Sequence, residues 1–257
     1  MPADTISVQR QGAVATLTLN RPQQRNGMIN RMVRELYECL LPLEADTDLR
    51  VLILTGAGDS FCVGADLNHY TSGAADEPLQ DSWFDLARLL HELPQVTIAA
   101  INGACAGAGF GMAAACDLRY AADTAVFNTA FLGVGASGDM GVPWTLSRIL
   151  GGAAARELCL FPDKFDAQRA LRLGLIQDCF PADELSAAVA TRAAALTRRA
   201  PQALRSMKQN FVAAERLSFK DYLDLETMRH RQSTASDDAR EAFRAYIEKR
   251  EPVFGKP

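Results

Sequence analysis

Two short apolar segments, Arg50–Thr55 (RVLILT) and Val96–Ile101 (VTIAAI), constrain the fold of this chain more than any other feature. Their apolar residues run almost without interruption, which is typical of strands in a parallel sheet covered on both faces. Between them, Leu79–Leu93 has the period of an amphipathic helix and ends at Pro94. Strand, crossover helix and strand in this order predict an α/β core with right-handed crossovers.

The segments on either side continue the pattern. Ser7–Gln9 and Val14–Leu19 are predicted strands of a hairpin, Met28–Leu43 is a predicted helix, and Leu118–Ala121 is a further strand. After Pro143 almost every pattern is helical, with predicted helices near 144–150, 153–160, 166–172, 183–199, 201–213, 218–235 and 238–250. We therefore expect a core over residues 1–199 and a C-terminal helical region over 200–257, which folds over the core or over a neighbouring subunit.

Composition excludes several classes of protein. The formal net charge of −4 argues against a basic face for nucleic acid. The apolar runs fall far short of the ~20 residues of a membrane helix, and the N-terminus shows no secretory signal pattern. No pair among the six cysteines has C-x-x-C spacing, and the three histidines are expected to be surface or satisfied core residues. We expect a cytoplasmic protein with reduced thiols, no metal and no redox cofactor.

Three glycine-containing stretches follow buried segments and bring backbone within reach of a ligand: Gly58–Leu67, Asn102–Met112 and Gly133–Trp144. The second is not a dinucleotide fingerprint, because its third glycine, Gly111, comes one place too early for G-x-G-x-x-G. No phosphate-binding G-x-x-x-x-G-K-[ST] loop occurs. The stretches therefore need another explanation.

Several motifs together resemble those of the crotonase (enoyl-CoA hydratase/isomerase) superfamily. They are FCVGADL at 61–67, LNRPQQRNGM at 19–28, AAINGACAGAGFGMAAACDLRYA at 99–121, the GDMG to LSRILG stretch ending at Gly151, and AYIEKR at 245–250. Their order and spacing cover nearly the whole chain. The resemblance implies a spiral of ββα repeats followed by a helical C-terminal region that forms homotrimers, which often pair into homohexamers, and it implies an acyl-CoA thioester as substrate.

The resemblance also implies a site. The backbone N–H groups of Ala65 and Ala108 would stabilise the oxyanion that develops on a thioester oxygen, as two aimed amides can without a charged side chain. The alternative is that small residues here only allow tight packing. By the same resemblance, the residues expected to bind CoA are Arg25, Val63, Ala65, Asp66 and Leu67. Lys249 is expected to reach the nucleotide from an adjacent subunit. Arg25 and Lys249 could equally be ordinary solvated cations.

The departures from the family pattern bear on the reaction. Hydratases of the family use two glutamates, which would stand at Gly111 and Phe131, and neither residue is a carboxylate. Asp139 remains, at the position of an aspartate in isomerase relatives and of the nucleophile in a dehalogenase relative. Desolvation by the flanking Met140, Val142 and Trp144 would raise its pKa and suit it to proton transfer. The alternative is that Asp139 caps the helix near Pro143 or closes a turn.

The leading hypothesis is double-bond isomerisation of an unsaturated acyl-CoA, because one carboxyl can take and return the same proton. Hydration, hydrolysis, dehalogenation and C–C cleavage stay open, as does a non-catalytic acyl-CoA binder. A serine hydrolase using Ser137 is disfavoured, since Asp139 replaces the last glycine of G-x-S-x-G. Four aromatic residues are candidates for lining an acyl pocket, with core packing as the alternative: Phe110, Phe131, Trp83 and Tyr70.

Overall fold

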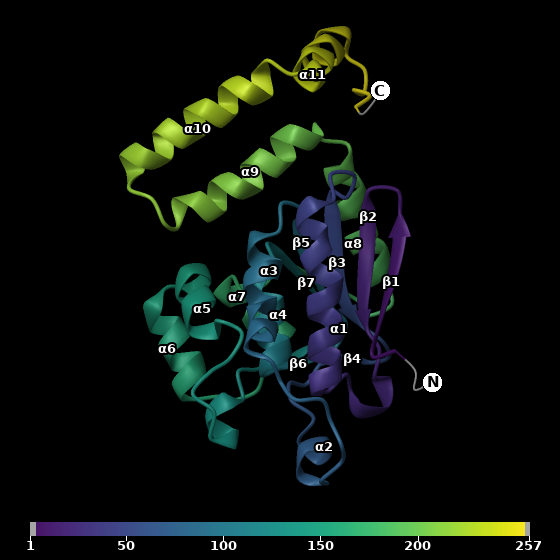
Figure 1. The fold of residues 1–257 in the computed structure, drawn as a ribbon, viewed down its shortest axis with the longest axis vertical. Coiled ribbons are helices and arrows are strands. Elements are labelled where there is room, and N and C mark those ends of the chain that lie inside the picture. The colour runs from purple at the N-terminus through teal and green to yellow at the C-terminus, as the bar shows by residue number, and fades with distance from the viewer. Residues whose placement is uncertain (1–3, 255–257) are drawn as a thin grey trace.

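The structure is a computed structural model that describes residues 4–254 (Figure 1). A six-stranded sheet has the order β1-β2-β3-β5-β7-β10, and its strands are β1 (Ile6–Gln11), β2 (Val14–Leu19), β3 (Val51–Gly56), β5 (Val96–Ile101), β7 (Leu118–Ala122) and β10 (Asp178–Phe180). A four-stranded sheet has the order β4-β6-β8-β9, with β4 (Ser60–Cys62), β6 (Ala104–Ala106), β8 (Val126–Asn128) and β9 (Phe165–Asp166). Apart from β1 with β2 and β8 with β9, neighbouring strands pair in parallel.

Helices cover both sheets and form the C-terminal region. They are α1 (Asn30–Leu40), α2 (Leu67–Thr71), α3 (Leu86–Glu92), α4 (Ala108–Ala115), α5 (Val142–Leu150), α6 (Gly152–Leu160), α7 (Ala167–Leu173), α8 (Leu185–Thr197), α9 (Pro201–Ala214), α10 (Phe219–Thr234) and α11 (Asp237–Glu248). Four 3₁₀ turns join them: η1 (Pro22–Gln24), η2 (Leu41–Ala45), η3 (Asp81–Asp85) and η4 (Phe131–Val134). Among the described residues, none of these helices has the length and apolar character needed to cross a membrane.

The buried strands β3 and β5 lie between two cores, as their nearly continuous apolar sequences predict. Leu52 and Leu54 of β3 face the large core beneath α1, α3 and α4, whereas Val51 and Ile53 face a smaller core closed by α8. Alternate side chains of a strand point to opposite faces, so a strand covered on both sides needs apolar residues throughout. The predicted parallel α/β core is confirmed.

The chain passes three times from the large sheet to the small one, which makes the expected ββα spiral. β3 is followed by β4, β5 by β6 and β7 by β8, and each pair is joined by a short turn. A helix or a 3₁₀ turn follows each short strand: α2, α4 and η4. The carboxyl ends of the parallel strands β4, β6 and β8 therefore meet at one edge of the small sheet.

Two sequence expectations differ in detail. The helix expected over Leu79–Leu93 begins only at Leu86, and the 3₁₀ turn η3 precedes it. The strands of the small sheet were not predicted, because segments of two or three residues are too short to show a period.

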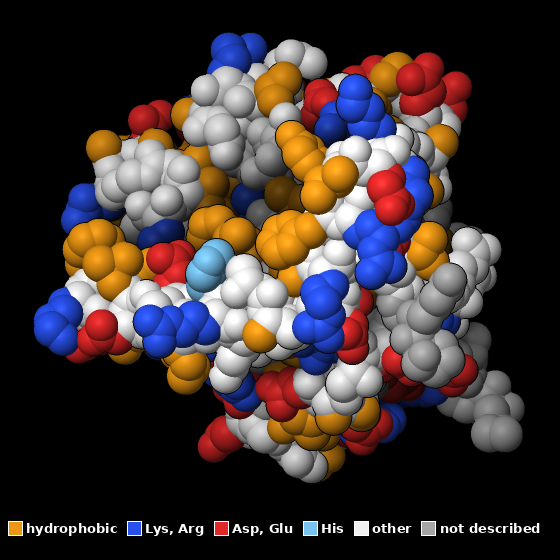
Figure 2. Space-filling model, turned by 90° about the horizontal axis from the view of Figure 1, so that it is seen from above, with side chains coloured by type: hydrophobic (Ala, Val, Ile, Leu, Met, Phe, Trp, Pro, Cys, Tyr) orange, Lys and Arg blue, Asp and Glu red, His pale blue; other side chains and the backbone are white. Residues whose placement is uncertain are grey.

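The C-terminal helices form an arm that lies over one end of the core (Figure 1). Lys208 of α9 is buried and pairs with Asp117, which follows α4, at 2.5 Å between Nζ and Oδ2. Figure 2 looks down onto the arm and shows hydrophobic side chains around a hollow on this face. Several large apolar side chains of the arm are exposed: Met207, Phe211, Phe219, Met228, Phe243, Tyr246 and Ile247.

Candidate active site

Two glycines bring the first two glycine-containing stretches into contact. Gly64 follows β4 with φ +87°, and Gly107 follows β6 with φ +52°, both in the left-handed region. A Cβ built on Gly64 would lie 3.3 Å from Gly107 Cα and 3.5 Å from Ala108 N. Because only glycine tolerates both the φ values and this approach, the loops meet without side chains between them. The amides of Ala65 and Ala108, which follow these glycines, therefore lie close to each other.

The Ala65 amide is left free by its neighbours. Met28 N donates to Gly64 O at 2.8 Å, and Asp66 N donates to Met28 O at 2.9 Å. These two bonds fix the backbone on both sides of Ala65. Within residues 4–254, Ala65 N donates no hydrogen bond to the protein, so this amide is available to a ligand.

The Ala108 amide is free for a different reason. Ala108 is the first residue of α4, and the first N–H groups of a helix have no intrahelical acceptor. Across the described chain it donates to no other group either. Its φ is not positive, so alanine is unstrained at this position. The helix dipole adds partial positive charge at this end, where an oxyanion would sit.

Helix α4 packs tightly against β4, which holds the two amides together. All eight residues of α4 are buried. A Cβ on Gly109 would overlap the Cys62 carbonyl and would lie 2.6 Å from Cys62 Cβ. Tight packing and a pair of free amides are therefore both properties of this segment.

Asp139 is half-buried, and among residues 4–254 no Lys, Arg or His side chain pairs with it. Its Oδ1 accepts a hydrogen bond from Met140 N at 2.7 Å. Burial raises the pKa of the carboxyl above its ordinary value, and the Met140 hydrogen bond only partly opposes this. The N-cap of α5 is Gly141, and no side chain caps that helix, so the helix-cap alternative for Asp139 is wrong. The turn is closed by the backbone carbonyl of Asp139, which accepts a hydrogen bond from Val142 N at 3.1 Å.

The space at Gly111 is already filled. A Cβ on Gly111 would overlap Met140 Cβ and would lie 3.1 Å from a methyl carbon of Val142. Ala108 and Gly111 are three residues apart, so they share one face of α4. The loop that carries Asp139 and Met140 therefore packs one turn along α4 from the free amide. Phe131 begins η4 and packs partly against the large core.

We expect Gly111→Ala to destabilise the fold by about 1–3 kcal/mol, because a methyl group there overpacks the contact with Met140. Gly133→Ala is the matched control, since Gly133 has open space around it and no left-handed φ. Urea unfolding of the two variants measures the difference. Equal stability of Gly111→Ala and the native chain would show that the Met140 loop is not held against α4.

The residues expected to bind CoA are only partly gathered in one chain. Arg25 and Val63 line a cleft of about 770 Å³, together with Ala106 at the end of β6 and Lys164 beside β9. Arg25 Nε lies 3.4 Å from Ser60 Oγ. The cleft is therefore lined both by a basic side chain and by the two segments that precede the free amides.

Asp66 and Leu67 open the helix α2 that follows the first loop. Asp66 caps α2 by accepting from His69 N at 3.0 Å, and it pairs with Arg21 at 2.9 Å. These hydrogen bonds outweigh burial and lower the pKa of the Asp66 carboxyl. The Asp66 side chain therefore stabilises the loop between β4 and α2. Leu67 is the first residue of α2 and is exposed.

Lys249 is not brought to this cleft within one chain. It is the C-cap of α11 and has a left-handed φ of +53°. The helix α11 lies at the end of the molecule opposite α2 (Figure 1).

The aromatic expectation is wrong for Phe110. Its ring is buried and meets Phe127 and Phe165 edge to face, at 6.4 Å between centroids in each pair, so it belongs to the core. Trp83 is also buried, and Tyr70 donates its hydroxyl to Asn30 Oδ1 at 2.8 Å. Phe131 lines a cavity beside α5 and α6.

Ser137 has no activating histidine. His69 pairs with Asp76 at 3.0 Å and His91 pairs with Glu215 at 2.8 Å, as expected of satisfied histidines. Within the described part of the chain, Ser137 makes no hydrogen bond to a histidine, which argues against a serine hydrolase.

The sequence predicts Met140 only as an apolar neighbour of Asp139, and its packing against α4 is not predicted. Its signal was the run Gly138-Asp139-Met140-Gly141, in which two glycines flank the acid and its neighbour. Glycines at such spacing indicate left-handed backbone, and this backbone turns Met140 toward α4.

Comparisons with known proteins identify the family of the chain. A model of the enoyl-CoA hydratase/isomerase family matches residues 9–257. The 1,2-epoxyphenylacetyl-CoA isomerase of Escherichia coli (strain K12) is 37% identical over 247 residues, which are 94% of each chain. The 2,3-dehydroadipyl-CoA hydratase of the same organism is 31% identical over 247 residues, covering 96% of this chain and 97% of that protein. A crystal structure of an enoyl-CoA hydratase from Bacillus anthracis superposes with a TM-score of 0.91 at 29% identity, covering 97% of this chain and 98% of that one.

The fold and these matches define an enzyme of the crotonase superfamily. Within it, the chain belongs to the enoyl-CoA hydratase/isomerase family.

Proposed function

We propose that the protein isomerises the double bond of an unsaturated acyl-CoA, with Asp139 as the acid/base and the Ala65 and Ala108 amides as the oxyanion hole. The Asp139 carboxylate takes a proton from C2 of a 3-enoyl-CoA. The electron pair of that C–H bond enters a dienolate, whose oxygen accepts from both amides. The protonated carboxyl then returns the proton to C4, and the double bond now joins C2 and C3.

The observation that carries this proposal is a lone, half-buried carboxyl in the loop packed against α4, beside a helix turn that presents a free amide. Hydration requires one group to activate water and another to handle the α-proton. Isomerisation requires one group only. The positions expected to hold glutamates, Gly111 and Phe131, supply no second carboxyl. The 37% identical relative is named as an isomerase of an epoxide-bearing acyl-CoA, which supports isomerisation of a CoA thioester in general.

We further propose that CoA lies along Val63–Leu67, with its phosphates near Arg25 and with Lys249 of a second copy completing the nucleotide site. The exposed apolar side chains of the arm support a homotrimer, because such a surface in water favours association. Arg25 has no carboxylate partner within 4.0 Å among residues 4–254, so its charge is available to a phosphate.

The direct test is to supply 3-enoyl-CoA and 2-enoyl-CoA thioesters of several chain lengths and to identify the products by mass spectrometry and NMR. The proposal predicts interconversion of the two, without a gain of 18 mass units. Formation of 3-hydroxyacyl-CoA as the main product would establish a hydratase instead. Binding of all the thioesters without turnover would indicate that the protein is a non-catalytic acyl-CoA binder.

A further inference from the structure

We propose that Met140 is a specificity-determining residue, which excludes water from the neighbourhood of Asp139 so that the acid returns its proton to the acyl chain. This inference rests on the proposed isomerisation. In this inference, an apolar side chain determines whether the proton returns to the substrate or exchanges with water.

The backbone at Met140 indicates that its placement is specific. Met140 has φ +50°, and Gly138 and Gly141 also have positive φ values of +126° and +67°. A methionine in the left-handed region costs roughly 1–2 kcal/mol, which the surrounding packing must offset. The side chain is 6% exposed, so that packing is extensive.

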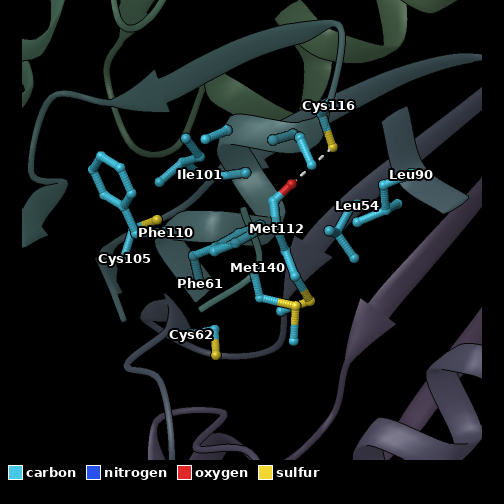
Figure 3. Close-up of a cluster of buried hydrophobic side chains, with 14 of the residues drawn as sticks. Leu54, Phe61, Cys62, Leu90, Ile101, Cys105, Phe110, Met112, Cys116 and Met140 are labelled. Atoms are coloured by element: carbon cyan, nitrogen blue, oxygen red, sulfur yellow. Dashed lines mark hydrogen bonds between the residues drawn. The ribbon is translucent and has the colours of Figure 1, made fainter. Parts of the chain in front are cut away.

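The side chain fills apolar space beside α4. Met140 lies in the large core cluster, which also contains Met112 and Cys62 (Figure 3). Its Cβ takes the place that a side chain at Gly111 would occupy. A thioether accepts only weak hydrogen bonds, so it cannot hold a water molecule as a carboxylate or an amide would.

Its position next to Asp139 gives this packing a chemical consequence. Met140 N donates to the Asp139 carboxylate at 2.7 Å, so the acid is fixed relative to the backbone that carries the Met140 side chain. During isomerisation the carboxyl carries the substrate proton between its removal from C2 and its return to C4. If water reaches the carboxyl in that interval, the proton is lost to solvent.

The test follows deuterium from C2 to C4 of a 3-enoyl-CoA labelled at C2, in ordinary water. The native chain is expected to retain label at C4, Met140→Leu to retain it, and Met140→Ala to lose it to solvent. Met112→Ala is the matched control, because Met112 is equally buried in the same cluster. It opens a cavity of similar size, and label retention should persist.

The outcomes separate this inference from the proposed function. Isomerisation by the native chain without any retained label would overturn the role of Met140 and leave the function standing. Equal retention by Met140→Ala and the native chain would also overturn it. Absence of isomerisation by the native chain would overturn the function itself. If Met140→Ala does not fold, Met140→Gln keeps the volume, adds a polar end that binds water, and should lose label.

Discussion

Asp139→Asn is expected to slow double-bond migration by about 10²–10⁴-fold, the usual contribution of a positioned general acid/base. Asparagine keeps the shape of the side chain but cannot accept and return a proton. KM should change little, because the free amides and the CoA contacts remain. Steady-state kinetics on a 3-enoyl-CoA measures both constants. Ser137→Ala, in the same loop, is the control and should keep native turnover.

The pH dependence follows from the surroundings of Asp139. Burial raises its pKa, so kcat/KM should fall as pH decreases through a value above the ordinary ~3.9 of an aspartate. The folded state binds the proton more tightly than the unfolded state does, so ionisation of Asp139 costs stability as pH rises through this range. Asp139→Asn should therefore be at least as stable as the native chain at neutral pH, and this advantage should disappear at acid pH. Native turnover in Asp139→Asn would remove the residue from the mechanism.

Ala108→Pro is expected to lower kcat by about 10²–10³-fold, the loss typical of one oxyanion-hole donor. Proline has no N–H, so the substitution deletes the amide itself. Ala108 is the first residue of α4, where proline is tolerated because no intrahelical hydrogen bond is lost. The Gly107 backbone that precedes it is already outside the helical region.

The control for this variant is Asp237→Pro at the first residue of α11. Asp237 is exposed, and Ser236 before it has the extended backbone that proline favours. Circular dichroism should show both variants folded, with only Ala108→Pro impaired. Unchanged kcat in a folded Ala108→Pro would mean that this amide does not hold the developing charge.

The sequence predicted the long elements well and the short ones poorly, for a physical reason. β3 and β5 are buried on both faces, so their composition alone reveals them. The strands β4, β6 and β8 have three residues each and are set by where the chain crosses between sheets. That crossing is a tertiary property which no local pattern records.

The site likewise has features that the sequence predicts and features that only the tertiary structure shows. Gly64 and Gly107 were visible as glycines, but their contact across two loops appears only when β4 and β6 pair. The pocket prediction for Phe110 is wrong because the sequence near an aromatic residue is similar whether the ring lines a pocket or packs in the core. In the structure the ring packs in the core. Burial of Asp139 was foreseen from its apolar neighbours.

The most direct measurement is a crystal structure of the protein with an acyl-CoA thioester bound. The account predicts that the thioester oxygen lies about 2.7–3.1 Å from both Ala65 N and Ala108 N, as oxyanion-hole donors require. It also predicts the Asp139 carboxyl about 3–3.5 Å from C2, within reach of its proton. A thioester oxygen bound elsewhere, with both amides facing solvent, would contradict it.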